Sequence, residues 1–285
     1  MLFASFCFAV MGGFAKELSK DMSAIEVVFF RNIFGVLFIL VTLFKYPIKQ
    51  KGGKLMLLLF RGFMGFFALL AFFYNIAHIS LAEAMTYSRT SPIFTALFAF
   101  IFLKERLHKI GWIALFVGFI GILFITRPYG VYDFDRFDIL GLFSGIGAAL
   151  AYTAVRELRE YYDTRAIVLS FMGVGTIGPV LLMLIGSFYA PSGLDYLFAK
   201  FITPHQKDIA LIVSLGISAT LAQYYMTKAY GETKAGIVGA VSYSNIVFSI
   251  FIGLFLGDKF PDMFTTIGIL LIMFAGVMIT FQPKS

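Results

Sequence analysis

Ten long apolar segments, separated by short polar breaks, constrain this chain more than any other feature of its sequence. A helix that crosses the hydrocarbon layer of a bilayer needs about 20 mostly apolar residues, with a usable range of roughly 17–25. A soluble protein of 285 residues could not bury a chain that is 60% hydrophobic and 14% charged, so much of this surface must face lipid. We therefore expect an all-α integral membrane protein with ten transmembrane helices. The predicted spans cover about residues 2–17, 24–44, 55–77, 82–103, 110–126, 139–155, 166–190, 209–227, 235–257 and 264–281.

The first apolar segment, Leu2 to Ala15, has a competing interpretation as a cleaved signal peptide. No basic segment precedes it, and Lys16 and Glu17 follow where small residues would mark a cleavage site. We expect this segment to be retained as the first helix.

Basic residues in the loops predict the orientation of the helices. The loops after even-numbered spans, together with the C-terminus, hold more Lys and Arg than the loops after odd-numbered spans. Because the side richer in basic residues stays in the cytoplasm, we expect a protein of the cell (inner) membrane with both termini inside. These loops also explain the formal charge of +7, so we expect no nucleic-acid partner.

The two halves of the chain resemble each other. The segment from Ala82 to Leu107 aligns with the segment from Ala235 to Phe260. We expect two repeats of five spans each, with domains at residues 1–130 and 131–285. Because five is odd, the second repeat enters the membrane from the opposite side. Inverted repeats of this kind build a central site that opens alternately to the two sides of the membrane, which is typical of a transporter.

Three motifs allow a comparison with a known family. They are Glu26 to Arg31 in the second span, Arg61-Gly62-x-x-Gly65 in the third, and a run from Ala82 through Pro92 to Leu107 that a glycine-rich span follows. With these motifs the chain resembles the EamA family of the drug/metabolite transporter superfamily over nearly its whole length. The resemblance implies a transporter of a small organic metabolite, such as an amino acid or a related compound. Relatives also include uptake carriers for cofactor-like solutes such as S-adenosylmethionine and riboflavin, which is the alternative function.

The second repeat departs from the family pattern at two positions. Asn245 stands where the first repeat has Pro92, and Asp258 stands where it has Glu105. If bending at the proline gates one side of the membrane, the two gates are not equivalent.

Arg89 is the strongest candidate for substrate binding because it lies inside the fourth span. A charge at membrane depth costs about 2.5–3.5 kcal/mol on insertion scales, so it normally faces a cavity or a partner. Its planar guanidinium can hold a carboxylate with two hydrogen bonds. Two alternatives stay open, in which Arg89 reaches to the outer interface or pairs with Glu83. For Arg31 and Arg61, which lie nearer helix ends, we expect structural anchoring.

Polar side chains recur at helical spacing on the fourth, eighth and ninth spans and predict a shared cavity. The alternative for single Ser and Thr residues is hydrogen bonding between helices. Pro92 removes the hydrogen bond to the Ser88 carbonyl and is the predicted hinge. The predicted substrate-binding residues are Tyr74, Tyr87, Arg89, Ser91, Tyr152, Gln223, Tyr224, Ser242 and Asn245.

No pattern in the sequence indicates catalysis. It contains no phosphate-binding glycine loop, no Ser/His/Asp constellation and no Cys/His cluster, so we expect no enzyme, no cofactor and no metal site. We also expect no carboxylate deep in a span. A membrane enzyme and a channel are remote alternatives. The expected partners are a small-molecule substrate and the lipid bilayer, and a homodimer is left open.

Overall fold

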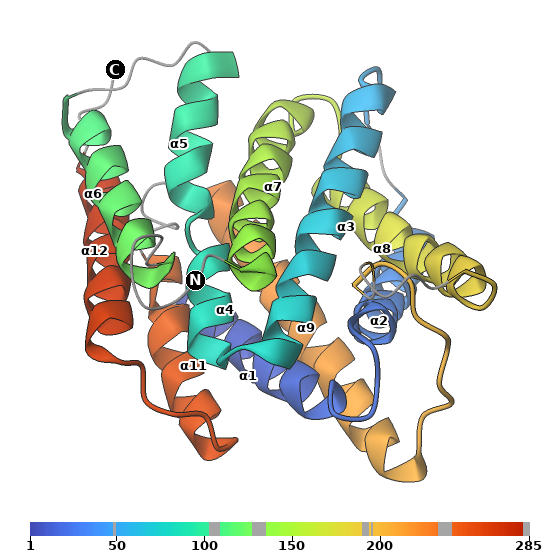
Figure 1. The fold of residues 1–285 in the computed structure, drawn as a ribbon. Coiled ribbons are helices and arrows are strands. Elements are labelled where there is room, and N and C mark those ends of the chain that lie inside the picture. The colour runs from blue at the N-terminus through green and yellow to red at the C-terminus, as the bar shows by residue number, and fades with distance from the viewer. Residues whose placement is uncertain are drawn as a thin grey trace.

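The computed structural model describes residues 1–47, 50–102, 109–126, 135–189, 194, 196–232 and 241–281, and the regular structure in these ranges is all α-helical (Figure 1). The helices cover most of the predicted apolar segments. They are α1 (Leu2–Leu18), α2 (Ala24–Lys45), α3 (Leu55–His78), α4 (Leu81–Ser88), α5 (Ser91–Phe102), α6 (Lys109–Thr126), α7 (Arg136–Leu158), α8 (Thr164–Gly186), α9 (Gln206–Glu232), α11 (Ser244–Phe255) and α12 (Met263–Thr280).

Five of these helices are long and apolar enough to cross a bilayer, namely α2, α3, α8 and most of α7 and α9. The helix α11 and much of α6 and α12 are shorter apolar helices. Large apolar side chains are exposed on the outward faces, among them Leu37, Phe116, Ile177 and Phe274. A surface of this composition is suited to lipid, and helices satisfy their own backbone hydrogen bonds there.

Side-chain caps fix where two of the long helices begin. Ser23 and Glu26 form a capping box at the start of α2, in which the Glu26 carboxylate accepts the Ser23 N–H at 2.9 Å. Asp135 and Asp138 form a second capping box at the start of α7. Each box satisfies N–H groups that have no partner inside the helix. Residues adjacent in sequence therefore set the polar ends of these two apolar helices.

Helices from the two halves of the chain interlock. The most extensive contacts join α3 to α7, α1 to α9, α2 to α8 and α6 to α12. Figure 1 shows α6 beside α12 at one edge of the molecule, and α2 beside α8 at the opposite edge. The largest apolar core cluster lies between these edges and draws mainly on α1, α2, α3, α4 and α9. Each of these close pairs joins one helix from each half.

The structure divides the expected fourth span, residues 82–103, into two helices. α4 ends at Ser88, α5 begins at Ser91, and Arg89 and Thr90 form the turn between them. An unbroken span was expected here, with a bend at Pro92, so the interruption falls earlier than the sequence predicts.

The expected ninth span, residues 235–257, is also interrupted within its described part. Val241 and Ser242 are helical, Tyr243 forms a turn, and α11 starts at Ser244. Residues 235–240 of this span lie outside the described ranges. In the alignment of the two halves, Tyr243 corresponds to Thr90, so both aligned segments change from one helix to the next at the same position.

Candidate functional site

The turn between α4 and α5 is held by hydrogen bonds of its own residues. The Arg89 N–H donates to the Met85 carbonyl at 2.9 Å and closes α4. The Thr90 hydroxyl donates to the Tyr87 carbonyl at 2.7 Å, and the Thr90 carbonyl accepts the Ile93 N–H at 3.0 Å at the start of α5. These bonds satisfy polar backbone groups that the interruption frees, which lowers the cost of a broken helix at membrane depth.

Pro92 and two glycines of α7 accommodate this turn. Pro92 lies in the first turn of α5, where its missing N–H leaves no helical hydrogen bond unmade. A Cβ at Gly145 would overlap Thr90 Oγ1, and one at Gly141 would lie 2.5 Å from the Tyr87 ring. Because glycine has no Cβ, α7 can approach the turn this closely.

Arg89 extends from the turn toward α1 and α11. Its Nε donates to Oδ1 of Asn245 at 3.3 Å, and its guanidinium carbon lies 5.6 Å from the centre of the Phe8 ring, within cation–π range. Asn245 is fully buried and donates its Nδ2 to the Ser5 carbonyl at 2.8 Å. Glu83, the alternative partner, accepts the Ser80 hydroxyl at 2.9 Å and helps to cap α4. Groups on α1 and α11 thus position the Arg89 cation.

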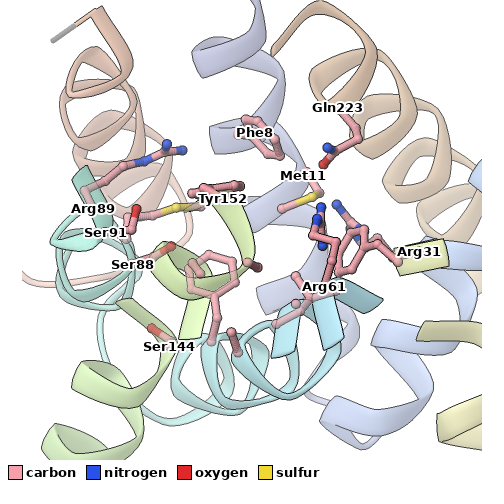
Figure 2. Close-up of a pocket in the computed structure, with 18 residues that line it drawn as sticks. Phe8, Met11, Arg31, Arg61, Ser88, Arg89, Ser91, Ser144, Tyr152 and Gln223 are labelled. Carbon is pink, nitrogen blue, oxygen red and sulfur yellow. The ribbon is translucent and has the colours of Figure 1, made fainter. Parts of the chain in front are cut away.

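A cavity of about 80 Å³ lies beside Arg89 and is lined by residues from α1 to α5 and from α7 to α9, as Figure 2 shows. This is room for several water molecules. Aromatic and aliphatic side chains form much of its wall. Among its described lining residues, three are arginines and none is Asp or Glu. The polar lining residues are Arg31, Arg61, Ser88, Arg89, Ser91, Ser144, Tyr152 and Gln223.

Arg31 and Arg61 lie at this cavity, although the sequence predicts anchoring near helix ends. Their exposed fractions are 2% and 3%, so neither guanidinium reaches an outer interface. The burial of these two residues could not be predicted from their position along the spans, because that position does not show which face of α2 or α3 packs inward. The available signal was a charge inside an apolar segment, the same signal that singled out Arg89.

Four of the predicted binding residues line the cavity: Arg89, Ser91, Tyr152 and Gln223. They come from the α4–α5 turn, α5, α7 and α9, and therefore from both halves of the chain. Asn245 joins this group indirectly through its hydrogen bond with Arg89.

The other predicted residues lie outside the lining. Tyr87 is buried and donates its hydroxyl to Asp138 of α7, and Tyr74 packs in an aromatic cluster at the end of α3. Ser242 is buried just before the turn at Tyr243. Tyr224 is 53% exposed, because it follows the inward-facing Gln223 by one residue, which is about 100° around a helix.

Glu26 is a fully buried carboxylate, but it lies in the first turn of α2 and not deep in the span. Glu26 has an exposed fraction of 0%, and its carboxylate accepts the Ser23 N–H and hydroxyl at 2.9 and 2.8 Å and the Ile202 N–H at 2.6 Å. These three donors account for its burial as a structural clamp at the start of α2. Within the described residues, no group of three or more His, Cys, Asp and Glu side chains could hold a metal ion.

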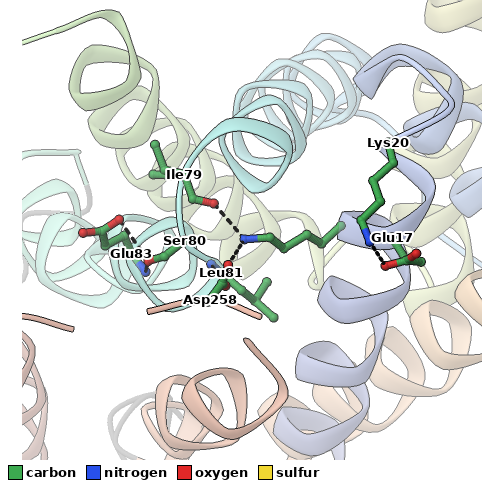
Figure 3. Close-up of polar contacts among 8 residues, drawn as sticks. Glu17, Lys20, Ile79, Ser80, Leu81, Glu83 and Asp258 are labelled. Carbon is green, nitrogen blue, oxygen red and sulfur yellow. Dashed lines mark hydrogen bonds and ion pairs between the residues drawn. The ribbon is translucent and has the colours of Figure 1, made fainter. Parts of the chain in front are cut away.

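A second polar cluster lies where α1, α4 and the end of α11 meet (Figure 3). Lys16 forms an ion pair with Asp258 and donates to the Ile79 carbonyl at 3.2 Å. Asp258 also accepts the Leu81 N–H at 2.9 Å at the start of α4. Gly257, with a φ of +91°, ends α11 and turns the chain toward this contact. The cluster ties the two halves together outside the cavity lining.

The chain matches known membrane transporters along nearly its whole length. The model of the EamA-like transporter family matches residues 1–127 and 136–281. The chain is 39% identical to an uncharacterized transporter of Helicobacter pylori over 98% of this chain and 92% of that protein. It is 32% identical to the pseudopaline exporter CntI of Pseudomonas aeruginosa over 99% of this chain and 94% of that protein.

Two further comparisons are more distant. The chain is 26% identical to the S-adenosylmethionine uptake transporter of Rickettsia prowazekii over 95% of this chain and 87% of that protein. A solved crystal structure superimposes with a TM-score of 0.59 over 98% of this chain and 96% of the other, at 16% identity. This structural likeness shows a shared fold alone.

Proposed function

We propose, because this chain belongs to the EamA-like transporter family, that it carries a small carboxylate-bearing metabolite, an amino acid or a related compound, across the cell (inner) membrane by alternating access. Its relatives are named as transporters rather than enzymes, and its apolar helices fit a multi-pass membrane protein. The substrate class rests on the cavity at Arg89, and the mechanism rests on how the two halves pack.

The observation that carries the substrate class is Arg89 on the interrupted helix beside a cavity whose described lining has no carboxylate. A guanidinium stays charged at any physiological pH and binds a carboxylate through two parallel hydrogen bonds. Inside a cavity of low dielectric this attraction is strong, and opening to water weakens it and permits release. Ser91, Tyr152 and Gln223 supply hydroxyl and amide groups to the same lining and fit the polar remainder of such a solute.

The helix contacts support two inverted repeats of five spans, with domains 1–130 and 131–285. In that arrangement α1 corresponds to α7, α3 to α9 and α5 to α11. Each contact then has a counterpart: α3 with α7 matches α9 with α1, and α5 with α7 matches α11 with α1. The pairs α2 with α8 and α6 with α12 are their own counterparts. Such pseudo-symmetry permits two states of similar energy, one open to each side.

The same proposal includes ten spans with both termini in the cytoplasm, as the basic loops predict. Transport is driven by a solute gradient or by exchange, because the sequence has no phosphate-binding glycine loop for ATP. A homodimer stays open, as in the sequence analysis.

Uptake of S-adenosylmethionine is a second candidate, favoured by the relative from Rickettsia prowazekii that carries this name. That solute has one carboxylate, but its sulfonium and ammonium groups make it a net cation. Three arginines, with no Asp or Glu among the described lining residues, attract anions and repel cations. The charge of the lining therefore favours a carboxylate-bearing solute with no net positive charge.

Flux into liposomes that contain the purified protein tests this function. A panel would hold amino acids, other organic acids, riboflavin and S-adenosylmethionine, together with the methyl ester of each acid as a matched solute without the carboxylate. We expect saturable, ATP-independent flux of one or more acids and no flux of the corresponding esters above that into protein-free liposomes. Equal flux of acid and ester, preferred flux of S-adenosylmethionine, or flux only after an ATPase is added contradicts the proposal.

A further inference from the structure

We infer that Arg31 and Arg61 form a second anion-binding subsite opposite Arg89, so that the transported solute carries two carboxylate groups, one toward each end. This inference rests on the proposed function, which requires only Arg89, and it narrows the substrate class to small dicarboxylates and higher acids. The sequence alone predicts that both residues anchor their helices at the membrane interface. Their burial at the cavity indicates instead that they bind the solute.

The two guanidinium groups lie over one aromatic ring. The guanidinium carbon of Arg31 is 5.3 Å from the centre of the Phe171 ring, and that of Arg61 is 4.6 Å from it. Gly65, one turn after Arg61, leaves space for this arrangement, because a Cβ there would overlap Nη1 of Arg61. A ring can stabilise a cation through its face, but it does not neutralise the charge. Two like charges beside each other in a region of low dielectric repel.

The described residues do not neutralise this pair. The Nη1 of Arg31 donates to Oδ1 of the neutral Asn32 at 2.6 Å, and the Nε atoms of both Arg31 and Arg61 are buried with no hydrogen-bond partner among the described residues. The ion pairs seen in the described part of the chain involve neither arginine. A buried charge without an anionic partner is costly, and a bound carboxylate would supply both the charge and the missing acceptors.

An anchoring role does not explain this geometry. An arginine that anchors a membrane helix extends its guanidinium to the polar interface, whereas these two are 2% and 3% exposed. Both instead contribute to the cavity lining that Arg89 shares. The paired cations therefore have the properties of a site that is completed by its ligand.

The position of the third arginine sets the shape of the ligand. Figure 2 shows Arg31 and Arg61 on one side of the cavity and Arg89 on the other, with Met11 and Tyr152 between them. Gln223 of α9 lies on the side of the paired arginines. A solute that satisfies both sides has two anionic ends and a middle that tolerates the Met11 thioether and the Phe8 ring. A linear dicarboxylate has this form, and a phosphorylated acid offers the same anionic chemistry at one end.

Equilibrium binding to the purified full-length protein tests the inference. The probes are linear dicarboxylates of four to eight carbons, the tricarboxylate citrate, and for each dicarboxylate its monoamide, which has the same length and one charge less. Phosphoglycerate serves as the phosphorylated acid. We expect at least one dicarboxylate to bind about tenfold or more tightly than its monoamide, as loss of one charged contact of about 1.4 kcal/mol implies.

Variants assign the preference to the paired arginines. Arg31→Gln and Arg61→Gln should each reduce the preference for the diacid over its monoamide to about twofold or less, while monoamide binding through Arg89 persists. Arg165→Gln is the control, since Arg165 bonds to two backbone carbonyls and to the Asp163 carboxylate at a helix start outside the cavity. This variant should leave the preference unchanged. The melting temperature of each unliganded variant shows whether it is folded.

Several results would overturn the inference. The comparison of diacid and monoamide on the wild-type protein does not depend on any variant, and equal affinity there contradicts a second anionic subsite. Tighter binding of phosphoglycerate than of every dicarboxylate assigns the site to phosphorylated acids and rejects the dicarboxylate. If the Arg31→Gln and Arg61→Gln proteins are folded and keep the full preference for the diacid, these residues do not bind the second carboxylate and have a structural role. In each case, flux of monocarboxylates in liposomes would leave the proposed function standing, whereas absence of any carboxylate flux would reject that function itself.

Discussion

The two segments that align within this chain, residues 82–107 and 235–260, share a backbone feature and differ in their chemistry. Both change from one helix to the next at the aligned residues Thr90 and Tyr243. The first segment places the cation Arg89 at its interruption, and the second places the neutral Ser242 at the aligned position. Asn245, which aligns with Pro92, crosses over to accept the Nε hydrogen of Arg89 at 3.3 Å.

This difference shows how a repeated fold can build one asymmetric site. The first interruption is closed by local hydrogen bonds and packs against glycines of α7. The second also has a local bond, from the Ile246 N–H to the Tyr243 carbonyl at 3.0 Å. The first segment supplies the charge of Arg89, and the second supplies the Asn245 amide that accepts its Nε hydrogen. We propose that Arg89 is the binding group and Asn245 its positioning group, and the predictions below separate these two roles.

The largest effect is expected at Arg89. Arg89→Ala removes the cation and should lower the transport efficiency for a carboxylate solute by about 100-fold, the loss typical of truncating one partner of a desolvated charge pair. Arg89→Lys keeps the charge but loses the planar fork and should cost about tenfold. Initial rates of flux in liposomes measure both. Tyr224→Ala, on the exposed face of α9, is the control and should transport normally. A stable Arg89→Ala protein with unchanged substrate affinity would remove this residue from the site.

The next largest effect is expected at Asn245. Asn245→Asp keeps the shape of the side chain but places a carboxylate beside Arg89, where it competes with the carboxylate of the solute. Substrate binding should weaken by about tenfold. Thermal unfolding checks that the variant is folded, because it also loses the donor to the Ser5 carbonyl. Ser249→Ala, one turn further along α11, removes a hydroxyl that donates to the Asn245 carbonyl at 2.7 Å and serves as the control. Unchanged binding by Asn245→Asp would show that Arg89 does not hold the anion.

A smaller effect, on stability rather than binding, is expected where α7 meets the first interruption. Gly145→Ala forces a Cβ against Thr90 Oγ1 and to 2.7 Å from the Tyr87 carbonyl oxygen, which should destabilise the protein by about 1–3 kcal/mol. Gly173→Ala of α8 is the matched control, because its Cβ would meet nothing within 4 Å and should be neutral or slightly stabilising. Thermal unfolding in detergent measures both. Equal stability of the two variants would contradict close packing of α7 on the turn.

The smallest effect is expected at Pro92. The turn is already closed by bonds of Arg89 and Thr90, and the proline lies where a helix tolerates it. Pro92→Ala should therefore change stability by less than about 1 kcal/mol, measured by the same thermal unfolding, and should leave the flux nearly unchanged. A large loss of flux at unchanged stability would instead support the hinge that the sequence predicts at this residue.

Much of the fold could be predicted because membrane helices are long and uniformly apolar, and α2, α3 and α8 follow the predicted segments closely. The position of Arg89 at a cavity could be predicted as well, because a charge inside an apolar span normally faces a cavity or a partner. The facing of each helix could not be predicted. Gln223 and Tyr224 are neighbours in one polar stripe, yet α9 turns the first inward and the second outward. The inward positions of Arg31 and Arg61 likewise depend on how α2 and α3 pack against α8.

The residue at which the fourth span is interrupted could not be predicted from the sequence either. Pro92 marks the fourth span as unusual, but a proline in the first turn of a helix is compatible with an interruption before it as well as with a bend. The Thr90 hydroxyl bond to Tyr87 and the fit of Gly145 against Thr90 decide between the two. The first is a local bond that a threonine can also make inside an unbroken helix, and the second joins residues that are far apart in the sequence.

The central claim is that arginines on two sides of one cavity hold the anionic groups of the solute. An experimental structure of the protein with the tightest-binding carboxylate from the binding series tests it most directly. We expect one carboxylate within hydrogen-bonding distance of Arg89, and a second within hydrogen-bonding distance of Arg31 or Arg61. A solute that occupies the cavity with its carboxylates turned away from all three guanidinium groups, or that binds outside the cavity, would contradict anion binding by these arginines.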